Sequence, residues 1–204
     1  MKTSVTIVNC GTGNARAIFN MYCRLDVTVS FATTAEEIRN ANRIVFPGVG
    51  SYDRVLAALD TFPGLRSAME TAVLANKVPF LGICLGMQLL FESSEEGTLS
   101  GFGWINGTCR KIRGTAELPV PHMGWGLVRN TRPSRLLERD FGERFYFAHS
   151  YSAYPVLHER ISGVVDYGVP LAAVVEQDNI FGVQFHPEKS HRSGMRVLRQ
   201  FACV

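Results

Sequence analysis

An almost unbroken apolar segment, Val78–Ile83, constrains the fold of this 204-residue chain more than any other feature. A segment that is apolar on both faces is typical of a strand at the centre of a parallel sheet. Three earlier apolar segments are also expected to be strands, at Ser4–Asn9, Val27–Phe31 and Arg43–Phe46, the last stopped by Pro47-Gly48. Helical segments separate these strands, which predicts an α/β fold.

The helices between these strands are indicated by apolar spacing and by capping residues. Apolar residues recur at helical spacing over Ala15–Leu25, and Leu65–Asn76 is expected to be another helix. Thr34 and Glu37 have the spacing of a capping box before a short helix. Ser51 is in position to cap the helix that follows.

The second half of the chain is richer in strands. Strands are expected at Gly103–Ile112, Arg144–Tyr151, Leu171–Gln177 and Phe181–His186, and a closing helix at Ser193–Cys203. The later strands are expected to add antiparallel pairs at one edge of an open, mostly parallel sheet flanked by helices. No repeat, low-complexity tract or long linker divides the chain, so residues 1–204 are expected to form one domain.

Composition excludes several classes of function. Hydrophobic residues make up 46% of the chain and charged residues 19%, which is typical of a soluble globular protein. The net charge of +3, without a Lys/Arg block, gives no reason to expect a nucleic-acid partner. No apolar run reaches the roughly 18 residues of a membrane span. Five cysteines without a CxxC pair or zinc pattern indicate the reducing cytoplasm, and no metal or cofactor is expected.

Gly82-Ile83-Cys84-Leu85-Gly86 places a cysteine where the central strand turns into a helix. This pattern is the cysteine version of the nucleophile elbow, in which glycines two residues either side relieve backbone crowding. The helix N-terminus is expected to favour the thiolate, and the Leu85 N–H to point toward an oxyanion. The alternative is a buried cysteine between two packing glycines.

His186 and Glu188 have the arrangement of a base and the group that orients it. Pro187 favours an extended conformation at His186, and residues two apart in an extended chain project to the same side. Glu188 is therefore expected to hydrogen-bond one ring nitrogen and leave the other free for the thiol proton. Taken singly, His186 is equally compatible with a satisfied histidine at a strand end, and Glu188 with a solvated loop carboxylate.

The loop Phe46-Pro47-Gly48-Val49-Gly50 follows the third strand. Its glycines allow backbone N–H groups to approach a ligand closely, which could supply a second oxyanion donor. An ordinary turn is the alternative. Because strand ends converge in open α/β sheets, this loop, Cys84 and His186 are expected at one crevice.

Together these motifs resemble those of the class I (triad) glutamine amidotransferases. PGVGSYD, GICLGMQLLFE and GVQFHPEKS occur in the family's order, and the resemblance spans essentially the whole chain. Within that family, PHMGWG at 121–126 and FYFAHSY at 145–151 are similar to the glutaminase subunits of imidazole glycerol phosphate synthases. The resemblance implies a flavodoxin-like domain with added antiparallel strands.

The resemblance also implies roles for particular residues. Cys84 would attack the side-chain amide of L-glutamine and release ammonia, while His186 shuttles protons and Glu188 orients it. The N–H groups of Val49 and Leu85 would hold the oxyanion. Glutamine would be bound with help from Gly50, Gln88, Ser150 and Tyr151.

A partner is implied as well. The family's partner is a (β/α)8-barrel cyclase, which forms a heterodimer with the glutaminase and uses the ammonia in histidine biosynthesis. Free ammonia in water becomes ammonium, which is no nucleophile, so a dry passage between the subunits preserves it. The residues near this contact would be Asn14, Met123, Trp125, Tyr146 and Lys189. Core packing is the alternative for Met123 and the two aromatic residues, and a solvated charge is the alternative for Lys189.

The chain departs from the family pattern at two places. Asn9–Asn14 reads NCGTGN where the family reads close to DYGMGN, and Gly126 stands where the family often has Asn. A paralogous glutaminase that feeds a different synthase, such as one in surface-polysaccharide biosynthesis, therefore stays open.

The same motifs bear on three other functions. A γ-glutamyl peptidase would keep Cys84 and His186 without a partner, and an inactive interaction subunit would not need an intact triad. A nucleotide-binding loop at Gly11–Arg16 is disfavoured, because Arg16 replaces the third glycine and no acid ends the strand Val27–Phe31.

Overall fold

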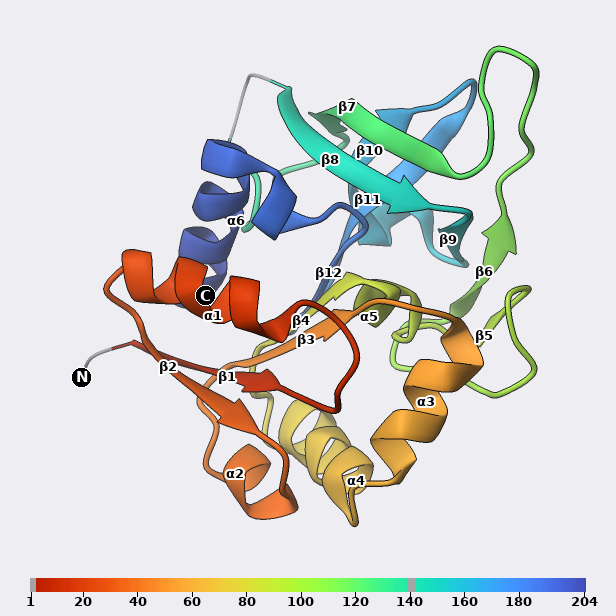
Figure 1. Ribbon diagram of the computed structural model, residues 1–204. Coiled ribbons are helices and arrows are strands. Elements are labelled where there is room, and N and C mark those ends of the chain that lie inside the picture. Colours follow the sequence, from red (N-terminus) through yellow and green to blue (C-terminus); the bar gives the residue numbers. More distant parts are fainter. Residues whose placement is uncertain (1–2, 139–141) are drawn as a thin grey trace.

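The computed structural model describes residues 3–138 and 142–204 and contains a nine-stranded mixed sheet at its centre (Figure 1). The strand order is β2-β1-β3-β4-β12-β11-β10-β7-β8. The first five strands in this order are mutually parallel. In chain order they are β1 (Ser4–Val8), β2 (Thr28–Ala32), β3 (Ile44–Gly48), β4 (Phe80–Cys84) and β12 (Ile180–Val183).

The other half of the sheet is antiparallel. Its strands are β7 (His122–Asn130), β8 (Glu143–His149), β10 (Ile161–Asp166) and β11 (Pro170–Gln177). A separate small sheet has the order β5-β6-β9. Its strands are β5 (Ser93–Ser94), β6 (Gly107–Lys111) and β9 (Tyr151–Pro155).

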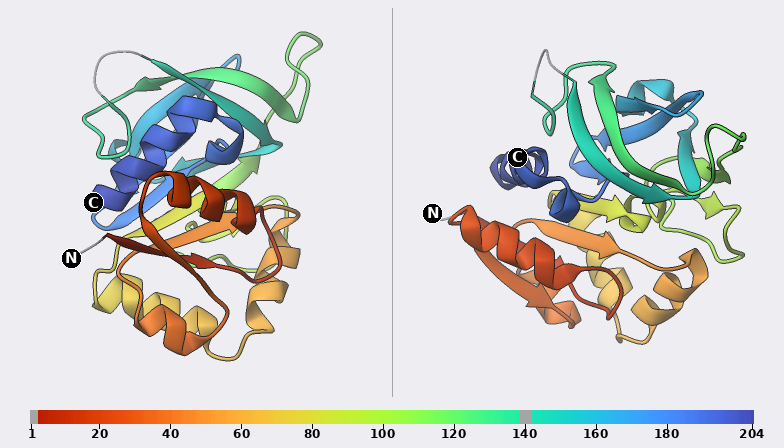
Figure 2. Two further views of the ribbon diagram at one scale, coloured as in Figure 1. Left: turned by 60° about the vertical axis from the view of Figure 1, so that its left-hand side comes forward. Right: turned by 45° about the horizontal axis from the view of Figure 1, so that its top comes forward.

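Helices cover both faces of the parallel half (Figure 1, Figure 2). On one face lie α1 (Ala15–Arg24) and α6 (His191–Cys203), side by side and sharing one apolar cluster with Ile7 and Ile83. The other face packs a second cluster under four helices. They are α2 (Ala35–Arg39), α3 (Tyr52–Asp60), α4 (Leu65–Glu70) and the short α5 (Leu85–Gln88). A sheet covered on both faces explains why its central strands are apolar throughout.

The expected α/β fold with added antiparallel strands is confirmed, and the antiparallel part is larger than the sequence indicated. Strands β7 and β10 were not predicted. Gly124, Gly126 and Gly163 interrupt the apolar alternation that would have revealed them. The expected strand Arg144–Tyr151 breaks at Ser150, since β8 pairs in the main sheet and β9 pairs with β6.

Several expected boundaries were also wrong. β3 continues through Pro47 to Gly48, because its pairing with β1 ends at Val45 and leaves an open edge for the missing N–H. The first expected strand of the second half shortens to β6. The strand expected to reach His186 ends at Val183, and the closing helix starts earlier, at His191.

The helix predictions differ in detail. The helix expected over Leu65–Asn76 is divided into α4 and a π-helical turn, η1 (Thr71–Ala75). The predicted capping box of Thr34 and Glu37 is present, with both reciprocal bonds. Ser51 occupies the N-cap of α3, but its side chain makes no capping hydrogen bond.

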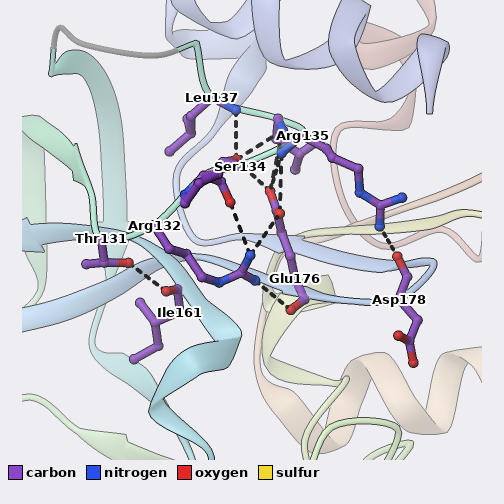
Figure 3. A network of polar contacts seen from close by, with 10 residues as sticks. Thr131, Arg132, Ser134, Arg135, Leu137, Ile161, Glu176 and Asp178 are labelled. Carbon is purple, nitrogen blue, oxygen red and sulfur yellow. Dashed lines mark hydrogen bonds and ion pairs between the residues drawn. The ribbon is translucent and has the colours of Figure 1, made fainter.

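A buried carboxylate fixes the segment that follows β7 (Figure 3). Glu176 of β11 is 5% exposed and accepts hydrogen bonds from Ser134 Oγ at 2.6 Å and from the N–H groups of Arg135 and Leu136 at 3.2 and 3.4 Å. The Arg132 guanidinium lies 3.8 Å from its Oε2. These contacts hold the loop against β11.

Three general observations apply to residues 3–138 and 142–204. No helix in this part of the chain has the length and apolar character needed to cross a membrane. His, Cys, Asp and Glu side chains do not gather there into a group of three or more that could hold a metal ion. All five cysteines lie in the described ranges and are free thiols.

Candidate active site

Cys84 lies at the sharp turn between β4 and α5. Its backbone has φ +54° and ψ −110°, a conformation that is uncommon and strained for a residue other than glycine. β4 lies between β3 and β12, with Gly48 opposite Cys84 and Val183 opposite Ile83. The cysteine therefore stands at the carboxyl end of the parallel strands, where ligands bind in such sheets.

The glycines around Cys84 are required by close packing of backbones. A Cβ atom on Gly82 would overlap the Gly86 carbonyl, and one on Gly86 would overlap the Phe46 carbonyl. The turn can therefore pack directly on β3 and β4 only with glycine at both positions. α5 has four residues, so the strong helix dipole expected beneath the sulfur is reduced to the contribution of a single turn.

His186 and Glu188 are in contact, through a different local geometry from the one expected. His186 Nδ1 lies 3.0 Å from Glu188 Oε1. His186 is extended, with φ −99° and ψ 101°, but Pro187–Lys189 form a 3-10 turn, η3, rather than a continued strand. The turn, and not strand alternation, brings the carboxylate behind the imidazole ring.

The η3 turn is anchored to β8. The backbone N–H of His186 donates to Tyr146 O at 2.9 Å. Ser190 Oγ donates to His186 O at 2.6 Å and accepts from the Tyr146 N–H at 3.0 Å. These bonds fix the histidine backbone relative to the antiparallel half of the sheet.

The electrostatics of His186 favour its charged form. Burial acts to lower the pKa of His186, but hydrogen bonds and charges from Cys84 and Glu188 prevail and raise it to about 10. Glu188 Oε2 is buried and has no hydrogen-bond partner among the described residues. The charged imidazole thus interacts with the Cys84 sulfur on one side and with the Glu188 carboxylate on the other, which is the arrangement of a nucleophile, a base and its orienting group.

A cavity of about 660 Å³ opens above these groups. All residues predicted to act in catalysis, in the oxyanion hole or in glutamine binding line it: Cys84, His186, Glu188, Val49, Leu85, Gly50, Gln88, Ser150 and Tyr151. Among the residues predicted near a partner, Asn14, Met123 and Lys189 also line it.

Trp125 and Tyr146 do not line this cavity. Trp125 of β7 packs edge-on to Tyr146 with ring centres 6.1 Å apart, and the Lys189 ammonium lies 5.3 Å from the Tyr146 ring centre. Met123 is 63% exposed and Trp125 is 41% exposed. Core packing, which was the alternative for these two residues, is therefore wrong.

Several cavity residues were missed from the sequence. Arg54 of α3 and Glu96, which follows β5, line the cavity with opposite charges. Burial raises the pKa of the Glu96 carboxyl. His149 also lines the cavity, and Gln184 Nε2 lies 3.7 Å from Cys84 Sγ. His149 and Gln184 had a sequence signal, because they sit inside the FYFAHSY and GVQFHPEKS motifs. Arg54 and Glu96 had none.

Comparison with known proteins gives matches over almost the whole chain. The family described as Glutamine amidotransferase class-I matches residues 6–203. The protein named imidazole glycerol phosphate synthase subunit HisH from Bdellovibrio bacteriovorus is 42% identical over 97% of this chain and 98% of its own length. The Arabidopsis thaliana protein named imidazole glycerol phosphate synthase hisHF, chloroplastic, is 40% identical over 97% of this chain and 33% of its own length.

Solved structures agree on the fold. A crystal structure described as glutamine amidotransferase superposes with a TM-score of 0.75 and covers 98% of this chain and 99% of that chain. Its sequence is 15% identical, so the similarity concerns the arrangement of helices and strands.

Proposed function

Because this chain belongs to the glutamine amidotransferase class-I family, we propose that it hydrolyses L-glutamine to glutamate and ammonia at Cys84. The observation that carries the proposal is the position of Cys84 in one cavity with a histidine that is hydrogen-bonded to Glu188. The whole chain, residues 1–204, would act as one glutaminase domain.

The reaction follows from the protonation of the pair. The Cys84 thiolate attacks the carbonyl carbon of the glutamine side chain, and the protonated His186 gives its proton to the departing nitrogen. Ammonia leaves and a γ-glutamyl thioester remains on the sulfur. His186, now neutral, removes a proton from water, which attacks the thioester and releases glutamate and the thiolate.

Two backbone N–H groups are proposed to stabilise the oxyanion of each tetrahedral intermediate. Leu85 begins α5, so its N–H has no acceptor within the helix and is free for a ligand. Val49 follows β3 in a loop where Gly50 has φ +119°. Glycine adopts several orientations at low cost, so we propose that the Val49 N–H becomes aligned when a partner binds.

Charges of both signs suit free glutamine as the substrate. Glu96 would pair with the α-ammonium group and Arg54 with the α-carboxylate, since both line the cavity. Gln88 uses its amide nitrogen on Tyr151 O and on Gln184 Oε1, each at 3.0 Å. Its own oxygen is left to accept a hydrogen bond from the substrate.

The ammonia is proposed to pass to a barrel-shaped cyclase subunit that makes imidazole glycerol phosphate and aminoimidazole carboxamide ribotide in histidine biosynthesis. Relatives named as HisH subunits support this acceptor over a different synthase. In the longer plant relative the matching region is one third of a chain named hisHF, which supports a second unit. The exposed apolar side chains of Met123 and Trp125 suit burial in such an interface. Free thiols at all five cysteines suit the cytoplasm.

The proposal is tested by reconstituting the chain with the cyclase and comparing wild type with Cys84→Ala. The variant is expected to lose glutamine-dependent synthesis while complex formation and synthesis from added ammonia are retained. Retained glutamine use would contradict the assignment of Cys84. Failure of the wild-type pair to use glutamine, with ammonia still accepted, would contradict the proposed activity.

Activation by the partner is tested separately. The isolated chain is expected to release ammonia from glutamine slowly, and the ligand-loaded complex much faster. Equal rates would show that the Val49 loop is already aligned in the free chain.

A further inference from the structure

We infer that Gln184 is a further catalytic residue, whose side-chain amide donates a hydrogen bond to the Cys84 sulfur and stabilises the thiolate. Gln184 is fully buried, and its Nε2 lies 3.7 Å from Cys84 Sγ. This inference rests on the proposed function, because it deepens the role of the same nucleophile.

The sheet register places Gln184 beside the nucleophile. Val183 is paired with Ile83 between the parallel strands β12 and β4, so the next residues, Gln184 and Cys84, are neighbours. The Gln184 backbone N–H donates to Ala173 O at 2.9 Å, which continues the contact with β11 past the end of β12. The backbone at this position is therefore fixed by strands on both sides.

A backbone carbonyl determines which end of the Gln184 amide faces the sulfur. The Tyr151 carbonyl can only accept, so the Gln88 group 3.0 Å away must be its NH2. The second N–H of that group donates to Gln184 Oε1 at 3.0 Å. With its oxygen used in this way, Gln184 presents its own NH2 to Cys84.

His149 binds the same carbonyl from the other side, and His122 in turn binds His149. His149 Nδ1 lies 2.8 Å from Tyr151 O, so this nitrogen carries the proton. Burial lowers the pKa of His149 to about 4, which keeps the ring neutral and makes its Nε2 an acceptor for His122 Nδ1 at 3.1 Å. The Tyr151 carbonyl thus accepts from His149 on one side and from Gln88 on the other, and Gln88 also donates to Gln184, which donates to the sulfur. Every donor in this network has an acceptor, and hydrogen bonds linked in this way polarise one another.

The proposed reaction benefits from a hydrogen-bond donor that stays beside the Cys84 sulfur at every step. His186 gives its proton to the departing nitrogen and takes one back from water before the sulfur leaves as a thiolate, so the charge beside the sulfur changes during the reaction. An amide N–H does not transfer its proton at any step, so it donates to the sulfur throughout the reaction. In a buried site, a donor already in place stabilises an anion at no cost of reorganisation.

The test is the pH dependence of Cys84 alkylation by iodoacetamide, followed at each cysteine by peptide mass spectrometry. The thiolate attacks the methylene carbon and displaces iodide, so the rate reports the thiolate. Gln184→Met, which keeps the length but removes the donor, is expected to move the midpoint upward by about one pH unit and to slow alkylation about 10-fold at pH values below the wild-type midpoint. An unchanged profile would overturn the inference.

A matched control and a second measurement separate this effect from loss of structure. Gln177→Met removes a similar amide, which donates to Trp104 O at 3.0 Å outside the cavity, and is expected to leave the Cys84 profile unchanged. An equal shift in that variant would overturn the inference. If Gln184→Met does not fold, NMR of the side-chain amides decides. The Gln184 signals are expected to move in Cys84→Ala while those of Gln177 do not, and unmoved Gln184 signals would overturn the inference.

Because alkylation needs no glutamine, it tests the contact of Gln184 with Cys84 independently of the proposed glutaminase activity. A wild-type protein that alkylates as expected but never hydrolyses glutamine would contradict the proposed function alone. Normal glutamine hydrolysis with an unchanged Gln184→Met alkylation profile would contradict this inference alone.

Discussion

Glu176 and Glu188 are buried to nearly the same extent, with 5% and 6% of their side chains exposed, yet their carboxylates are bound in opposite ways. Glu176 Oε1 accepts from a hydroxyl and two backbone N–H groups, and its Oε2 faces a guanidinium (Figure 3). Glu188 has one bond to His186, and its Oε2 has no partner among the described residues.

The difference indicates that Glu176 has a structural role and that Glu188 has a role in catalysis. Full satisfaction of a buried charge makes it costly to remove, because every partner is then left unpaired. A partly satisfied charge contributes less to stability and can respond when the charge on its neighbour changes. The strained φ of Cys84 belongs to the same region as Glu188, as is typical of functional sites.

Glu188→Gln is expected to produce the largest change. Loss of the charge behind His186 is predicted to lower the glutaminase rate of the complex by about 100- to 10,000-fold. The free energy of unfolding should change less than in the matched Glu176 variant, because the amide oxygen can still accept from Nδ1 and the replaced Oε2 has no hydrogen-bond partner to lose. Steady-state ammonia release and urea unfolding measure the two effects. A large loss of stability with an unchanged glutaminase rate would show that Glu188 is structural and not catalytic.

Glu176→Gln is the matched substitution in the other region. It is expected to lower the free energy of unfolding by about 2 kcal/mol, because the new amide nitrogen faces Arg132 and a backbone N–H. Glutaminase activity should stay within about two-fold of wild type below the unfolding transition. A selective loss of activity in a stably folded variant would show that this network also serves the active site.

His186 and His149 are expected to give the stability of the protein opposite dependences on pH. The His186 pKa is raised from 6.5 to about 10, so its stabilisation is complete below pH 6.5 and is lost as the pH rises through 10. The His149 pKa is lowered from 6.5 to about 4, so stability falls as the pH drops from 6.5 toward 4. Urea unfolding across this range should show a smaller alkaline loss in His186→Asn and a smaller acid loss in His149→Gln. The same dependence of unfolding free energy on pH in wild type and in both variants would contradict the raised pKa of His186 and the lowered pKa of His149.

The sequence was informative where the chemistry lies in short motifs. Cys84 with its glycines, and His186 with Glu188, each occupy a few consecutive residues at a strand end, so local rules could place them. Gln184 lies in the same segment, but its contact with the sulfur depends on the register between two strands far apart in the chain. Arg54 and Glu96 come from a helix and an irregular segment with no spacing rule of their own.

The fold shows the same division. The parallel half was predicted, because buried strands and intervening helices have strong local patterns. The antiparallel half was predicted only in part, because β7 is exposed along much of its length and contains two glycines. The break at Ser150 follows from pairing with β6, a contact that no local pattern encodes.

The most direct test of the account is mass spectrometry of the acid-quenched complex after mixing with glutamine. A glutamyl group is expected on Cys84 and on no other cysteine, present in wild type and absent from His186→Asn. A glutamyl group on another residue, or hydrolysis that proceeds normally without Cys84, would contradict it.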